Sequence, residues 1–372
     1  MTVGEETDQR EWRLRERWSK TSDLLRGLDS EALLLTAPSD VRWLTGYSGS
    51  NGAALAVVGK PPLLATDGRY ADQAAEECPN VSIVVTRDLI DQLLMRLREY
   101  SVSSLVVDPS SMTLAEFRAI AAHPAVFGIG VREEPAPVAS LRQSKDPHEL
   151  ECLRRACQIS CDALELLLPE IVVGVSELAL ARRLEWQMGE LGADDRSFET
   201  IVATGPNGGQ PHHQPGLREL APGDLVTVDF GALVEGYHAD CTRTFIVDAE
   251  PEEWQKEIYQ VVRLAAEEGR SAAQPGVATK EVDAAARSVI TEAGFGGNFV
   301  HGLGHGVGLD IHEAPMLGAA TAGTLGDAVP VTVEPGIYLP GQGGVRIEDT
   351  CLVRDEGLEI MTDFPRDLIR VG

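Results

Sequence analysis

The chain has 372 residues, of which 43% are hydrophobic and 24% are charged, and its formal net charge is -26. These proportions are typical of a soluble globular protein with about two domains. A surface this acidic repels phosphate groups, so the charge argues against nucleic acids and anionic membranes as partners.

Three further features of the sequence indicate the cellular compartment of the protein. The first residues mix charges of both signs without an apolar core, so they do not resemble a signal peptide. No segment approaches the roughly 20 apolar residues that span a bilayer. The six cysteines form no C-x-x-C pair, and we expect reduced, mostly buried thiols. Together these features predict a cytoplasmic protein.

The first part of the chain predicts an α/β domain. A helix is expected over residues 11–28 and another over 90–100, with short apolar strands in ALLLTAP, LLATDGRY, SIVVT and SLVVD. DVRWLTGYSGSNGAALAVVG is interpreted as a turn that leads into one more strand. The proline-rich, polar segment FGIGVREEPAPVASLRQSKDP is interpreted as a linker. We therefore place the domains at residues 1–140 and 141–372.

The second part of the chain contains two copies of a similar order of helices and strands. Helices are expected over residues 147–168 and 176–192 before a strand-rich stretch, and over 252–273 and 279–293 before another. LVTVDFG, at residues 225–231, returns as PVTVEPG at residues 330–336. The sequence therefore predicts a duplicated unit of helices followed by a strand hairpin.

Each repeat carries two acids, Asp229 and Asp240 in the first and Glu334 and Glu348 in the second. Because side chains alternate along a strand, Asp229 and Glu334 are expected on the face opposite the valines of their strands. One such acid alone is best explained as a solvent-exposed residue. Four acids in matched positions need cationic compensation, and two divalent cations held by four carboxylates and one imidazole would provide it.

The stretch HGLGHGVGLDIHE, residues 301–313, supplies imidazoles between glycines that disfavour a helix and lack the spacing of a phosphate-binding loop. Glycines let the backbone pass close to the hairpins, so that one histidine can complete the metal shell. TGPNGGQPHHQPG adds His212 and His213, and a structural role is the alternative for His213. One nitrogen among oxygens suits Mn2+, Fe2+ or Co2+, with Zn2+ as an alternative.

These segments match a known family. VDFGALVEGYHADCTRTF, HGLGHGVGLDIHEAP, VTVEPGIY and GGVRIED resemble the aminopeptidase P and prolidase group of the "pita-bread" metallopeptidases. DVRWLTGYSGSNG and TDGRY resemble its N-terminal domain, and LRQSKDPHELECLRRA resembles its entry into the catalytic domain. The resemblance covers nearly the whole chain. It implies a small mixed-sheet N-terminal domain followed by a pseudo-twofold pita-bread catalytic domain.

The resemblance also implies a ligand set for two divalent metals, with Mn2+ expected. Asp229 would hold one metal, Asp240 and Glu348 would bridge both, and His305 with Glu334 would hold the other. A bridging water or hydroxide would be the nucleophile, with Glu334 helping to position and deprotonate it.

Four more residues match the substrate side of the family's site. His212, His301 and His312 match histidines that bind substrate and stabilise the tetrahedral intermediate, and Arg346 matches an arginine at the substrate end. The Pro-His-His doublet leaves His213 as an alternative to His212. Cys241 and Cys351 depart from the pattern, and we expect them to be core residues rather than neighbours of the metals.

The resemblance implies a peptidase that cleaves between an N-terminal residue and a following proline, and a homodimer is expected. We favour an Xaa-Pro aminopeptidase, with an Xaa-Pro dipeptidase restricted to dipeptides as the alternative. A metal-free creatinase-like hydrolase and a non-catalytic peptide-binding homologue are disfavoured, because all five ligand positions are intact.

Overall fold

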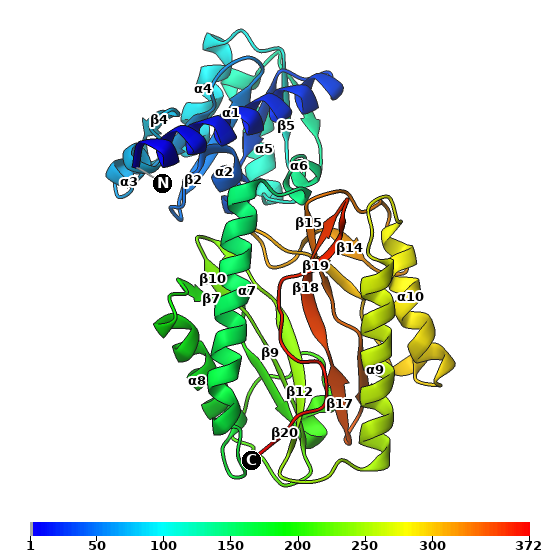
Figure 1. Ribbon diagram of the computed structural model, residues 1–372. Coiled ribbons are helices and arrows are strands. Elements are labelled where there is room, and N and C mark those ends of the chain that lie inside the picture. Colours follow the sequence, from blue (N-terminus) through cyan, green and yellow to red (C-terminus); the bar gives the residue numbers. More distant parts are fainter. Residues whose placement is uncertain (1–2) are drawn as a thin grey trace. The chain divides into compact units, whose positions relative to one another are not determined.

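The computed structural model describes residues 3–372; residues 1 and 2, at the start of the predicted N-terminal domain, lie outside it. The chain divides into two compact units, with the boundary along the sequence between Arg142 and Gln143. Both mix helices with sheets (Figure 1), as the predicted fold class requires.

A six-stranded sheet forms the centre of the first unit, in the order β4-β3-β2-β1-β5-β6. Its strands are β1 Ala32–Leu35, β2 Gly52–Val57, β3 Leu63–Thr66, β4 Ser82–Val85, β5 Ser104–Val107 and β6 Gly130–Glu133. Its helices are α1 Val3–Gly27, α2 Pro38–Thr45, α3 Ala71–Glu77, α4 Leu89–Glu99, α5 Leu114–Ala122 and α6 Ala139–Gln143. The β1–β2 and β2–β3 pairs are antiparallel and the others parallel, so the sheet is mixed.

Two expectations for this unit are wrong. The segment predicted as a turn contains most of α2, a helix that starts at Pro38 and ends where Gly46 takes a left-handed φ of 81°. The predicted linker contains α6 and the edge strand β6, which pairs in parallel with β5. These elements are too short for their apolar periodicity to show in the sequence.

The second unit is built around a nine-stranded sheet whose main path runs β14-β13-β15-β18-β12-β9-β8. The strands of that path are β8 Ile201–Thr204, β9 Leu225–Phe230, β12 Cys241–Val247, β13 Gly304–Gly306, β14 Glu313–Leu317, β15 Val329–Val333 and β18 Glu348–Arg354. β19 Gly357–Ile360 pairs with β18, and β20 Arg370–Val371 pairs with β12. The helices are α7 Pro147–Leu167, α8 Glu177–Glu190, α9 Glu253–Ala272 and α10 Thr279–Glu292.

The sheet has two similar halves that meet where β12 pairs with β18. Helices α7 and α8 flank the half that contains β9, and α9 and α10 flank the half that contains β15 (Figure 1). Each helix pair shares a hydrophobic core with its own strands. The predicted duplication is therefore confirmed.

Strand register brings the repeated acids together. Thr242 of β12 lies opposite Asp229 on one side and opposite Glu348 on the other. Asp240 is two residues before Thr242, and Glu334 directly follows Val333, which lies opposite Asp349. All four acids therefore approach one face of the sheet. The sequence did not reveal the small hairpins between the paired strands, β10 Ala232–Val234 with β11 Tyr237–His238 and β16 Gly336–Leu339 with β17 Gly343–Arg346.

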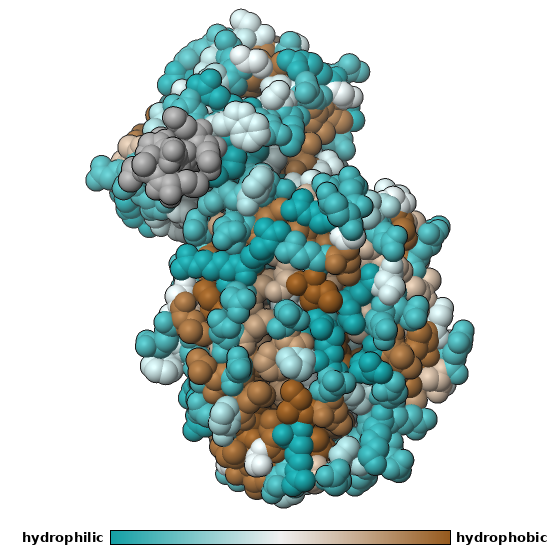
Figure 2. All heavy atoms as spheres, viewed as in Figure 1, coloured by the Kyte–Doolittle hydropathy of each residue, from teal (hydrophilic) through white to brown (hydrophobic). Residues whose placement is uncertain are grey.

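None of the helices in the described part of the chain combines the length and apolar composition that a membrane crossing requires. Hydrophilic side chains cover much of the face in Figure 2, and hydrophobic ones gather in groups between them on the second unit.

The opposite face of the sheet holds a buried ionic cluster around Asp349. Its carboxylate accepts hydrogen bonds from Arg243 at 2.8 Å, Arg270 at 3.0 Å and Arg366 at 2.7 Å. Asp349 is completely buried, and the Arg243 side chain is 1% exposed. Arg243 also donates to the carbonyls of Phe364 and Pro365, so the cluster attaches the C-terminal segment to the sheet.

We predict that Asp349→Asn lowers the free energy of unfolding of the second unit by about 3–5 kcal/mol, because the amide leaves buried guanidinium groups without a counter-charge. Urea unfolding measures the change. The control is Glu359→Gln, which removes a half-exposed partner of Arg154 and should cost about 0–1 kcal/mol. Equal losses for the two variants would contradict the prediction.

Candidate active site

A cleft of about 630 Å3 lies over the face of the sheet that carries the four acids. Its polar lining includes every sequence-predicted site residue: Asp229, Asp240, His212, His301, His305, His312, Glu334, Arg346 and Glu348. His213 also lines it. Apolar side chains form other parts of the wall: Phe198, Ile201, Pro215, Ile311, Met316 and Leu317.

The carboxylates and one imidazole converge at the floor of the cleft. Asp240, His305 and Glu348 each offer a ligand atom, and these atoms lie within 4.8 Å of one another. The Nε2 atom of His305 is 3.6 Å from an Asp240 oxygen and 3.4 Å from a Glu334 oxygen. Asp229 joins the group through the row of paired residues across β9, β12 and β18.

The tautomer and charge of His305 indicate that this group of side chains lacks a cation. Its Nδ1 lies 3.1 Å from the carbonyl oxygen of Gly306, and a carbonyl only accepts, so Nδ1 carries the proton. Burial, with the neighbouring His312, lowers the pKa of His305 to about 4, so the ring is neutral and Nε2 has a free lone pair. That lone pair faces carboxylate oxygens. Such an arrangement is repulsive without a cation and is the usual orientation of a metal-ligating histidine.

The carboxyl groups also indicate that positive charge is missing. Burial and the charge of Glu348 raise the pKa values of Asp240 and Glu334 well above the usual range for carboxyl groups. Burial and Asp229 raise the pKa of Glu348 to about 8. In addition, Oδ1 of Asp229 is buried and has no hydrogen-bond partner among the described residues. These donors therefore fit divalent cations, which would supply the missing positive charge.

A hydrogen-bond network fixes the other oxygen of Asp229. Arg346 donates to Asp229 Oδ2 at 2.6 Å and to the hydroxyl of Tyr338 at 2.8 Å. The Tyr338 hydroxyl lies 2.8 Å from Nε2 of His301, whose Nδ1 donates to the carbonyl of Gly302. Tyr338 therefore donates to His301.

Sequence reasoning missed Tyr338. Its position in VTVEPGIY, four residues after Glu334, was the available signal. Burial raises the pKa of this tyrosine to about 12, so its hydroxyl keeps its proton.

The remaining histidines fall into two kinds. His212 and His312 are exposed within the cleft, and the His312 ring packs edge-on against His305 at 4.3 Å between centroids. His213 instead places Nε2 2.8 Å from the buried carboxylate of Glu177. The geometry thus leaves His212 as the member of the doublet that faces open space.

Cys241 and Cys351 are fully buried and belong to the hydrophobic cores, as expected. Strand alternation directs Cys241 away from the face that carries Asp240 and Thr242.

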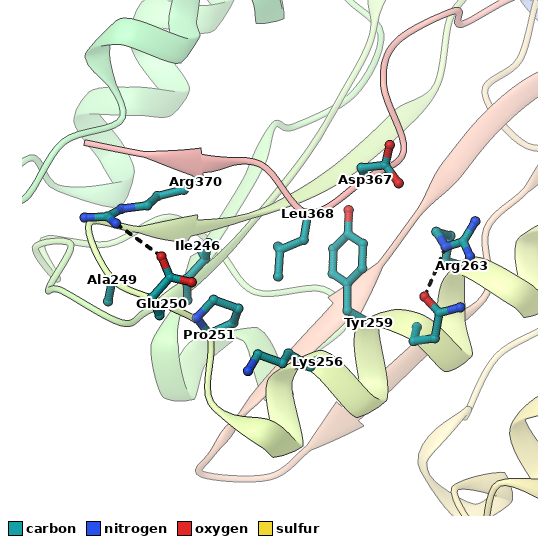
Figure 3. Close-up of a pocket in the computed structure, with 11 residues that line it drawn as sticks. Ile246, Ala249, Glu250, Pro251, Lys256, Tyr259, Arg263, Asp367, Leu368 and Arg370 are labelled. Carbon is teal, nitrogen blue, oxygen red and sulfur yellow. Dashed lines mark hydrogen bonds and ion pairs between the residues drawn. The ribbon is translucent and has the colours of Figure 1, made fainter.

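Two other features lack the chemistry of this cleft. In a hollow of about 370 Å3 near the C-terminus, two arginines are already engaged by neighbouring side chains. Arg370 forms an ion pair with Glu250, and Arg263 donates a hydrogen bond to Gln260 (Figure 3). His148, Cys152 and Glu235 also bring possible ligand atoms within 4.8 Å of one another. Glu235 is exposed and His148 partly exposed, so neither experiences the desolvation found at the cleft floor.

Comparison with known proteins agrees with this chemistry. Residues 151–355 match the model of metallopeptidase family M24, and residues 17–126 match the creatinase/prolidase N-terminal domain. The chain belongs to metallopeptidase family M24. The metallopeptidase is an exopeptidase of the Xaa-Pro aminopeptidase and prolidase group, and its family implies divalent metal ions.

Three relatives illustrate the similarity. An Xaa-Pro dipeptidase of Pyrococcus furiosus is 40% identical over 232 residues, which are 62% of this chain and 66% of the relative. The structure of an Xaa-Pro dipeptidase from Bacillus anthracis superposes with a TM-score of 0.91 at 35% identity, covering 96% of this chain and 100% of that one. The X-Pro aminopeptidase of Thermotoga maritima gives 0.87 at 32% identity, covering 95% and 99%.

We predict that Asp240→Asn raises the melting temperature of the metal-stripped metallopeptidase by about 2–8 °C, equivalent to about 1–2 kcal/mol, because it removes one buried, mutually repelling carboxylate. The same variant should lose most of the rise in melting temperature that Mn2+ produces in the wild type. Differential scanning fluorimetry measures both. Asp195→Asn, at an exposed position, is the control. A wild-type response to Mn2+ in Asp240→Asn would contradict the prediction.

Proposed function

We propose that the protein is a dinuclear Xaa-Pro dipeptidase, which hydrolyses the bond between an N-terminal residue and a C-terminal proline. The observation that carries the proposal is the convergence of His305 and the four carboxylates at the floor of the cleft. The sequence motifs are shared by both activities, and the expectation from the sequence is an aminopeptidase. The dipeptidase alternative has better support, from the printed activities of the Pyrococcus furiosus and Bacillus anthracis relatives. The aminopeptidase stays the second candidate because of the Thermotoga maritima relative.

The proposed ligands are those that the family resemblance implied. Asp229 would hold one metal, His305 and Glu334 the other, and Asp240 and Glu348 both. When bound, two divalent cations supply Lewis acidity and lower the pKa of water at the site. Manganese is the proposed metal, because one imidazole among carboxylates suits it.

The residues around the ligands hold them in place. Thr242 donates to Glu348 at 2.6 Å, and Arg346 donates to the Thr242 hydroxyl at 3.1 Å. Arg346 also bonds Asp229, so one guanidinium restrains carboxylates from both repeats. Since Arg346 is buried and engaged with protein partners, we propose that it positions ligands rather than contacting substrate.

The chain's own groups would perform the proton transfers. Glu334, whose Oε1 is 3.4 Å from the Thr332 hydroxyl, is placed to accept a proton from the attacking water. His212 and His312 face the open cleft, where an imidazole N–H can donate to the oxygen that becomes negative in the tetrahedral intermediate. His301 already accepts from Tyr338, so its proposed role is to orient that hydroxyl.

The first test compares substrates for the Mn2+-loaded protein. We expect kcat/KM for Ala-Pro to exceed that for Ala-Pro-Ala by at least about tenfold, because recognition of a free carboxylate contributes about 1.5–3 kcal/mol. Ala-Ala is the control for proline specificity. Equal cleavage of the tripeptide at its first bond would favour the aminopeptidase. No cleavage of either proline peptide by protein with two bound metals would exclude both candidates.

A second test concerns His312. We predict that His312→Ala lowers kcat by about 10²–10³-fold, the usual effect of removing one donor to a developing oxyanion. Metal content, measured by mass spectrometry, should stay at the wild-type value. His148→Gln, on α7 and outside the cleft lining, serves as the control. A loss of activity in proportion to lost metal would show instead that His312 supports the metal site.

A further inference from the structure

The segment 204–216, here called the His212 loop, crosses from the end of β8 to the wall of the cleft. It begins with the short helix at Gly205–Gly209 and contains Pro211, His212 and His213. The dihedral freedom of such a loop would allow His212 many positions. The structure attaches the loop at both sides of this residue.

On one side, the carbonyl of Pro211 accepts a hydrogen bond from Arg346 Nη1 at 3.3 Å. Gly208 packs against the backbone of β17, and a Cβ at Gly208 would lie 3.1 Å from the nitrogen of Gly344. The same guanidinium bonds Asp229, so this attachment connects the loop to the carboxylate cluster.

On the other side, the loop is bound to Glu177, the first residue of α8, whose carboxylate is completely buried. Oε1 accepts from the backbone N–H of Thr204 at 2.9 Å and from the side chain of Asn207 at 2.9 Å. Oε2 accepts from the backbone N–H of Gly216 at 3.0 Å and bonds Nε2 of His213 at 2.8 Å.

The four hydrogen-bond partners that the described residues offer the Glu177 carboxylate all belong to the His212 loop, at both of its ends and in its middle. A carboxylate offers about four lone-pair sites, and these partners occupy them. Hydrogen bonds to a charged, desolvated acceptor are stronger than those between neutral groups. One side chain outside the cleft lining therefore holds both ends and the middle of the loop, in addition to the Arg346 contact at Pro211.

We propose that Glu177 is a positioning residue of the active site, which acts with His213 to fix the His212 loop and thereby the imidazole of His212. The proposal rests on the proposed function insofar as His212 contacts substrate. It gives the two members of the doublet separate roles, since His213 is attached to Glu177 while His212 projects into the cleft.

The first test is hydrogen exchange of Glu177→Gln, followed by mass spectrometry. The variant keeps the side-chain volume, but its amide nitrogen cannot accept from Gly216 N–H. We expect faster exchange in segment 204–216 and wild-type exchange in β9 and β12. Glu185→Gln, on the same helix and paired with Arg196 at the surface, is the matched control. Unchanged exchange of the loop in Glu177→Gln would overturn the proposal.

The second test is a double-mutant cycle on dipeptide hydrolysis. We expect Glu177→Gln to lower kcat/KM by about 10–100-fold, because small displacements of a catalytic group have effects of this size. In a His212→Ala background the same change should lower it by less than about twofold, since the effect passes through His212. The same large loss in both backgrounds, or a parallel loss of bound metal, would overturn the proposal.

His213→Gln provides a milder variant if Glu177→Gln folds poorly, because three of the four bonds to Glu177 remain. We expect it to give a smaller change of the same kind in both tests, and wild-type behaviour would overturn the proposal. If the wild type hydrolyses no Xaa-Pro peptide, the proposed function fails, whereas the exchange measurement still decides whether Glu177 holds the loop.

Discussion

The second unit depends on a single electrostatic constraint, the desolvation of four carboxylates on one face of its sheet. Burial and mutual repulsion raise the pKa values of Asp240, Glu334 and Glu348, so these three cannot all be ionised there without nearby positive charge. The protein itself supplies only part of that charge, through Arg346. The neutral His305 presents a lone pair rather than a proton to the same region. The site is thus arranged for divalent cations, which would supply the missing positive charge.

The sheet separates two charge clusters of opposite composition. Glu348 and Asp349 are consecutive in β18, so their side chains project to opposite faces. Glu348 joins the carboxylates of the cleft, whereas Asp349 is surrounded by Arg243, Arg270 and Arg366. The arginine cluster holds the strand that carries Glu348, since Arg243 also donates to the Glu348 carbonyl. The position of a metal ligand is thereby connected to the packing of the C-terminal segment.

Much of this architecture could be predicted from the sequence because the catalytic unit is a repeat. LVTVDFG and PVTVEPG marked equivalent strands, and their register shows the acids on one face as alternation required. Short elements were missed or misinterpreted, α2 and β6 among them, because a few residues cannot show a period. The residues themselves indicated the histidine-bearing loops, whereas the roles of the individual histidines and of Arg346 were predicted through resemblance to a family, which gave neither Tyr338 nor Glu177.

The sequence by itself determined that the four acids lie on one side of two equivalent hairpins, through residue type and strand alternation, and that histidine-bearing segments accompany them. Only the tertiary structure decided how those residues are used. Asp229 is hydrogen-bonded to Arg346, His301 to Tyr338 and His213 to Glu177. His212 and His312 instead face the cleft. These assignments depend on hydrogen bonds between segments far apart in the chain, which local sequence patterns do not encode.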